Sequence, residues 1–84
     1  MVQPMTIGEI PAKKLRDNKS KTVREAIDAF LELPQPMWDS AWVGSGRVQM
    51  CFTVEPISYK RLKEKAKKFG YSFNQAVEIG LMAL

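Results

Sequence analysis

The sequence RVQMCFTV, residues 47–54, alternates strictly between apolar side chains and small or polar ones. A period of two predicts a β-strand with one buried face and one exposed face. The apolar face consists of Val48, Met50, Phe52 and Val54, and the other of Arg47, Gln49, Cys51 and Thr53. A lone strand leaves unpaired N–H and C=O groups along both edges, so this strand needs a partner. The rest of the chain shows no convincing second strand.

Two helices are expected directly after this strand. Pro56 suits the first turn of a helix, where its missing N–H costs nothing, and Gly70 is a natural cap at the end of that helix. Ser72 opens the second helix and forms a capping box with Gln75. Apolar residues recur at helical spacing in both segments: Tyr59, Leu62, Ala66 and Phe69 in the first, and Phe73, Ala76, Val77, Gly80, Leu81 and Leu84 in the second.

The strand and the two helices together occupy residues 47–84. This segment is shorter than roughly 40 residues, and a domain of that size rarely folds alone. A single cysteine excludes an internal disulfide, and no histidine or cysteine pair is present for a structural zinc site. We therefore expect a twofold dimer in which the strand pairs antiparallel with its own copy. The expected dimer core consists of Val48, Met50, Phe52, Val54, Leu62, Ala66, Val77 and Leu81.

Residues 1–46 form an N-terminal extension with one predicted helix at about residues 20–33. Thr22 and Glu25 fit a capping box at its start, and its apolar face carries Val23, Ile27 and Phe30. Residues 34–46 follow as a loop with two prolines, two tryptophans and a short Gly/Ser hinge.

Residues 1–19 have no strong periodicity and are interpreted as a loop or a frayed arm. No convincing repeat is found, although REAIDAFLEL has the apolar rhythm of a second helix from the same sort of motif. The apolar face of the predicted helix and the two tryptophans must be buried. We expect them to pack on the protein's own dimer, with a protein partner as the alternative.

The formal charge of +4 is unevenly placed. Residues 1–46 carry six basic and six acidic side chains, whereas residues 47–84 carry seven basic and three acidic ones. A basic half favours an anionic partner such as nucleic acid or a lipid surface, although a solvated lysine-rich face would have the same composition.

The order of strand, basic helix, glycine turn and Ser-capped helix in RVQMCFTVEPISYKRLKEKAKKFGYSFNQAVEIGLMAL resembles the ribbon-helix-helix superfamily of Arc/MetJ-like DNA-binding repressors. This resemblance covers residues 47–84. It implies a mainly α-helical fold, an intertwined dimer with an intermolecular two-stranded ribbon, and double-stranded DNA as partner. Gly80 departs from the family pattern, in which alanine is usual. It either loosens the helix by up to about 1 kcal/mol or allows closer packing.

The resemblance also implies which residues contact DNA. The outward side chains of the ribbon would read bases in the major groove, which admits a two-stranded ribbon. By position these are Gln49, Cys51 and Thr53, with Arg47 at the entrance. The start of the second helix would bind a phosphate through the backbone N–H groups of Ser72, Phe73 and Asn74.

The sequence thus predicts a homodimeric, sequence-specific DNA-binding protein, either a transcriptional repressor or an accessory factor of a mobile element such as a plasmid or phage. The alternative is an antitoxin-type interaction module whose residues 1–46 bind a protein partner. A basic amphipathic helix on an anionic membrane is a weaker reading, because Tyr59 and Phe69 are needed in the core.

Catalysis is not expected, because the chain has no histidine, no nucleophile–base pair and no phosphate-cradling loop. No metal or cofactor is expected. The lack of a signal-peptide pattern, of a long apolar run and of a cysteine pair predicts a cytoplasmic protein.

Overall fold

The computed structural model describes residues 2–15, 19–44 and 46–84. Within these ranges the chain is mostly helical with one two-stranded antiparallel sheet, which is compatible with a ribbon-helix-helix-like topology. The elements in chain order are β1 (Val2–Gly8), α1 (Glu9–Ala12), α2 (Lys19–Glu32), the 3₁₀ helix η1 (Ser40–Val43), β2 (Arg47–Thr53), α3 (Pro56–Phe69) and α4 (Phe73–Met82).

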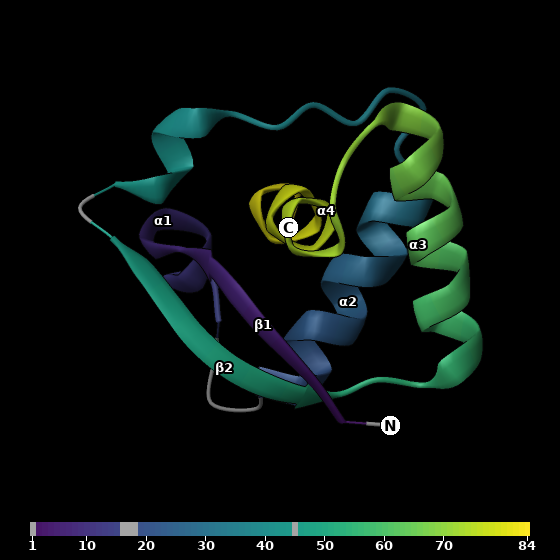
Figure 1. Cartoon of the computed structure of the whole chain (residues 1–84), viewed down its shortest axis with the longest axis horizontal. Helices are drawn as coiled ribbons and strands as arrows, with labels where there is room; N and C mark the ends of the chain where they lie inside the picture. Colours follow the sequence, from purple (N-terminus) through teal and green to yellow (C-terminus); the bar gives the residue numbers. More distant parts are fainter. Residues whose placement is uncertain (1, 16–18, 45) are drawn as a thin grey trace.

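The predicted strand exists as β2, but its partner is β1 of the same chain. The two strands pair antiparallel from Val2 opposite Thr53 to Gly8 opposite Arg47, and they run side by side in Figure 1. The prediction that the chain has no second strand is therefore wrong. The prediction that its first residues form a loop or arm is wrong for the residues of β1 and α1. Residues 1 and 16–18 of the predicted arm lie outside the described residues. A second chain is not needed to pair β2.

The helices of the second half begin and end as the sequence predicts. Pro56 occupies the first turn of α3, and Gly70 ends it in the left-handed conformation with φ of 81°. The N–H of Tyr71 then donates to the carbonyl of Ala66 over 2.8 Å, so the chain folds back onto the last turn. Ser72 and Gln75 form the predicted capping box at the start of α4.

The helix predicted at residues 20–33 is α2, and it begins at Lys19. Thr22 and Glu25 therefore lie within the helix, and the capping box predicted for them is wrong. The predicted apolar face is confirmed, since Val23, Ile27 and Phe30 are fully buried. This face packs mainly against α4 of the same chain.

The core lies between the inner face of the ribbon and the helices. Figure 1 shows β1 and β2 along one side, α4 near the centre, and α2 and α3 beyond it. Most of the predicted core residues are buried there: Phe52, Val54, Leu62, Ala66, Val77 and Leu81. Met50 is half-buried. Val48, expected in the same core, is 36% exposed, although Ile7, which pairs with it, is fully buried.

Helices α2 and α4 cross at very short range. A Cβ atom added to Gly80 of α4 would lie 2.0 Å from the carbonyl oxygen of Ala26 in α2 and 2.6 Å from its carbonyl carbon. Such distances are far inside van der Waals contact, so only glycine fits at this point of the crossing. Of the two roles considered for Gly80, closer packing is the one observed.

The connection between the two halves runs from the end of α2 along one side of the molecule, past the turn between α3 and α4, to η1 and then β2 (Figure 1). Trp38 is half-buried there, and its Nε1 donates to the carboxylate of Glu78, which is 2% exposed, over 3.2 Å. Tyr71 donates from its hydroxyl to the carbonyl of Pro36 and accepts from the N–H of Trp38, each over 3.3 Å. The tryptophan-containing segment is thus packed on its own chain, whereas the expectation placed it on a dimer.

Lys65 joins α3 to the end of α2. Its ammonium donates to the carbonyls of Phe30 and Leu31 in the last turn of α2 and to that of Leu33 just beyond it. The carbonyls at a helix end lack the acceptor role within the helix that the earlier ones have. Partial burial, and to a smaller extent the nearby ammonium of Lys68, lowers the pKa of Lys65. The contacts to the carbonyls favour the charged form and oppose this effect. Lys65 therefore acts as a C-terminal cap provided by another helix.

Across residues 2–15, 19–44 and 46–84, none of the helices has both the length and the apolar character needed to cross a membrane.

Candidate nucleic-acid interface

The ribbon presents one face to the helices and the other to solvent. On the inner face, Met5, Ile7 and Phe52 are buried. The opposite face, here called the outer face, consists of four directly paired couples: Val2 with Thr53, Pro4 with Cys51, Thr6 with Gln49, and Gly8 with Arg47. Because side chains alternate along a strand, all of these residues except the glycine project their side chains from that one face.

The structure places all four predicted base-reading residues on the outer face. Arg47, Gln49, Cys51 and Thr53 are all exposed. They share this face with residues that the sequence did not single out: Val2, Pro4 and Thr6. Thr6 is half-exposed, while Val2 and Pro4 are exposed. Apart from Arg47 and Gln49 the side chains are short, so the ribbon could lie close against a flat or grooved partner.

The two halves of the chain repeat one order of elements, strand then helix then helix. Residues 6–15, TIGEIPAKKL, align without a gap to residues 53–62, TVEPISYKRL, with Thr, Ile, Lys and Leu identical at the same places. Residues 22–27, TVREAI, correspond in the same way to residues 76–81, AVEIGL, and the first, second, fifth and sixth positions are buried in both. The first half differs mainly in its first helix, since α1 has 4 residues and α3 has 14.

Equivalent residues of the two halves meet at two places. Pro4 is equivalent to Cys51, and these residues lie directly opposite each other in the ribbon. Ala26 is equivalent to Gly80, and these residues form the close crossing of α2 and α4. A twofold rotation that exchanges the halves brings equivalent residues together only on its axis. The two meetings are what an approximate twofold axis between the halves of one chain would produce.

The predicted phosphate-binding residues lie at the start of α4. Ser72 is the N-cap residue, and the hydrogen bonds of the capping box join its hydroxyl and backbone N–H to Gln75. The ring of Phe73 packs on Tyr59 with 4.9 Å between centroids, so its side chain faces the protein and only its backbone could serve a phosphate. The N–H groups of a first helical turn have no acceptor within the helix.

A surface hollow of about 280 Å³ lies beside this helix start. It is lined by Lys63, Glu64, Ala66, Lys67, Tyr71, Ser72 and Phe73. Two lysines and one glutamate give the hollow a net positive charge, which adds to the positive end of the α4 dipole. The region can therefore attract an anion.

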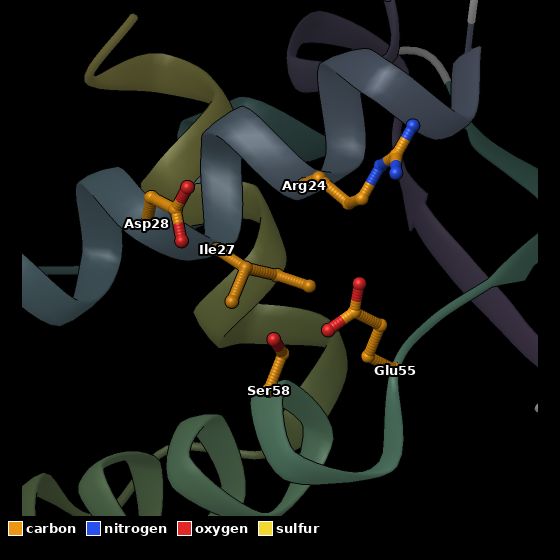
Figure 2. A pocket seen from close by; sticks show the side chains of 5 residues that line it. All are labelled: Arg24, Ile27, Asp28, Glu55 and Ser58. Atoms are coloured by element: carbon orange, nitrogen blue, oxygen red, sulfur yellow. The ribbon is translucent and has the colours of Figure 1, made fainter.

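A second hollow, of about 190 Å³, lies between α2 and the start of α3. Figure 2 shows Arg24, Ile27 and Asp28 on α2 facing Glu55 and Ser58 across it. It is smaller than the roughly 300–1,000 Å³ of ordinary small-molecule sites. Its lining carries one arginine, two carboxylates and the hydroxyl of Ser58.

Within the described ranges, no three His, Cys, Asp or Glu side chains gather as a metal site would require. Comparisons of the chain with protein-family models, with curated proteins and with solved structures find no significant match.

Proposed function

We propose that this protein binds double-stranded DNA in a sequence-specific manner, with the outer face of the β1–β2 ribbon in the major groove. The carrying observation is a two-stranded ribbon with the helices on its inner face, which leaves on the other face a row of mostly exposed side chains that are short or polar. A two-stranded ribbon fits the width of the major groove. The chain would then be a ribbon-helix-helix protein, acting as a transcriptional repressor or accessory DNA-binding factor.

The residue types on the outer face suit base recognition. Gln49 can bond an adenine through two hydrogen bonds, and Thr53 and Thr6 can hydrogen-bond or touch a thymine methyl group. Arg47 at one end of the ribbon can bond guanine or a phosphate. Cys51 and Pro4 at the centre are small enough to let the ribbon approach the base edges.

Phosphate contacts would come from the start of α4. The N–H groups of Phe73 and Asn74, the dipole of α4 and the lysines of the adjacent hollow all favour an anion there. Such contacts fix the position of a protein on the duplex without reading its sequence.

One chain suffices for this mode of binding, because both strands of the ribbon belong to it. The alternative of a free N-terminal extension that binds a protein partner has weaker support. The apolar face of α2, which motivated that alternative, is buried against α4, and Trp38 is packed on Glu78 of the same chain.

Selection of bound sequences from random double-stranded DNA tests the proposal. We expect an enriched site, to which Gln49→Ala binds with a loss of roughly 1–3 kcal/mol while its affinity for random DNA is unchanged. Gln35→Ala is the matched control, because Gln35 is an exposed glutamine between α2 and η1, away from the ribbon in sequence. Arg47→Ala should weaken all sequences and reduce the dependence of affinity on salt.

The proposal fails if no sequence is enriched. It also fails if Gln49→Ala and Thr53→Ala both leave the sequence preference of the wild-type protein unchanged.

A further inference from the structure

We infer that the protein recognises a non-palindromic DNA site as a single chain, in one fixed orientation, because the two ends of its outer face carry different side chains. This inference rests on the proposed DNA binding and adds the symmetry of the site. A dimer of identical strands presents the same residues on both sides of its axis and reads an inverted repeat. A ribbon made of two different strands has no such constraint.

The antiparallel register is symmetric about the pair Pro4–Cys51, which divides the outer face into two ends. One end, here called the Gln49 end, carries Gln49 with Thr6, followed by Arg47 with Gly8. The other end, here called the Val2 end, carries Val2 with Thr53.

Comparison of equivalent positions shows where the ends differ. Thr6 and Thr53 are equivalent and identical, so the ends share one threonine each. Gln49 is equivalent to Val2, an amide against an aliphatic side chain that is 67% exposed. Beyond the threonines, Gly8 of the Gln49 end is equivalent to Glu55, which is exposed and negatively charged.

These differences change what each end can bind. The Gln49 end has an amide and a guanidinium group, which form bidentate hydrogen bonds to adenine and guanine respectively. Among the described residues, the Val2 end offers one group for base hydrogen bonding, the threonine hydroxyl, together with apolar surface that suits thymine methyl groups. The carboxylate of Glu55 lies next to that end and repels phosphate, whereas Arg47 attracts it. The preferred half-sites must therefore differ in sequence.

The test uses the sites that the full chain selects from random double-stranded DNA. We expect a non-palindromic consensus, bound by one chain per site in sedimentation equilibrium with the selected duplex. Gln49→Ala should lose roughly 5- to 150-fold in affinity on the selected duplex, and base preference should be relaxed in one half of the site only.

The decisive variant is Val2→Gln, which makes the two ends alike at their main point of difference. Val2 is exposed, so this change leaves the core intact. Its selected consensus should become more nearly an inverted repeat, with the former Val2 half acquiring the base preference of the Gln49 half. Val2→Ala is the control, and its consensus should stay non-palindromic.

The outcomes separate the inference from the proposed function. An inverted-repeat consensus for the wild-type protein, or two chains on each selected duplex, would overturn the inference and leave sequence-specific DNA binding intact. Absence of any enriched sequence would overturn both.

Discussion

Replacement of Gly80 by alanine should destabilise the protein, although alanine is the better helix former. Alanine in place of glycine inside a helix is worth about 0.5–1 kcal/mol in favour of folding. Against this, the new Cβ would lie 2.0 Å from the carbonyl oxygen of Ala26, where ordinary contact begins at 3.4 Å. The obstacle is backbone and cannot rotate away, so α2 and α4 must separate by about 1 Å or more.

Overpacking of a well-packed core costs about 1–3 kcal/mol, and a clash with backbone belongs at the upper end. With the gain in helix propensity subtracted, we expect Gly80→Ala to lower the free energy of unfolding by about 2 kcal/mol. For a domain of this size that corresponds to a fall in Tm of about 8–16 °C.

Urea denaturation followed by the fluorescence of the two tryptophans measures this change. Gly46→Ala is the control, because a Cβ at Gly46 meets nothing within 4 Å. Its free energy of unfolding should change by less than about 0.5 kcal/mol. If Gly80→Ala were as stable as the wild-type protein, the backbone-to-backbone crossing of α2 and α4 would be refuted.

Three further predictions concern the contacts between the two halves. Lys65→Met should lower the free energy of unfolding, measured by urea denaturation, by about 1.5–3 kcal/mol, because α2 loses its charged cap. Lys67→Met, at an exposed position of α3, should be nearly neutral, and equal effects of the two variants would contradict the capping role. Trp38→Phe should cost about 1–3 kcal/mol because the buried carboxylate of Glu78 loses a donor, and a neutral result would exclude that bond. Deletion of residues 1–8 should abolish cooperative unfolding, since Met5 and Ile7 leave the core; a stable truncated protein would contradict the pairing of β1 with β2.

The second half of the chain could be read from its sequence because its local features agree with one another. The alternation in β2, Pro56 and Gly70 at the ends of α3 and the capping box at Ser72 each indicate the same elements. The four outer residues of β2 followed from the same alternation, and the structure places them on an exposed face. Their contact with DNA stays a prediction.

The first half was not predictable by the same reasoning. β1 contains Pro4, and Gly8 ends it; both residue types are depleted in strands. A proline is tolerated there because each strand of a two-stranded sheet is an edge strand. α1 has only 4 residues, too few for a helical period to show.

The internal repeat was the one feature of the sequence that could have revealed β1. The likeness of TIGEIPAKKL to TVEPISYKRL is clear once the two are placed together. The repeat is hard to detect because the strand and the second helix are separated by fewer residues in the first half than in the second. No single offset in residue number therefore aligns both the strands and the second helices. If the repeat is overlooked, the unpaired strand favours a dimer and residues 1–46 resemble an extension.

The central claim is that one chain provides both strands of the ribbon, and a cross-strand disulfide tests it most directly. Pro4→Cys places a second cysteine directly opposite Cys51. Proline has no N–H to donate, so in a β-sheet it occupies positions where the backbone hydrogen bonds between strands need no donor. Pro4 and Cys51 are therefore a non-hydrogen-bonded pair, and the Cα atoms of such a pair lie about 4.5 Å apart. That distance lies within the range that a disulfide spans. Val2→Cys is the control, because its diagonal distance of about 7–8 Å from Cys51 is too long.

After mild oxidation at micromolar concentration, mass spectrometry and non-reducing electrophoresis give the result. We predict that Pro4→Cys forms a disulfide within a molecule of single-chain mass and that Val2→Cys does not. A disulfide-linked dimer of Pro4→Cys with little single-chain product, or no disulfide at all, would contradict a ribbon built from β1 and β2 of one chain.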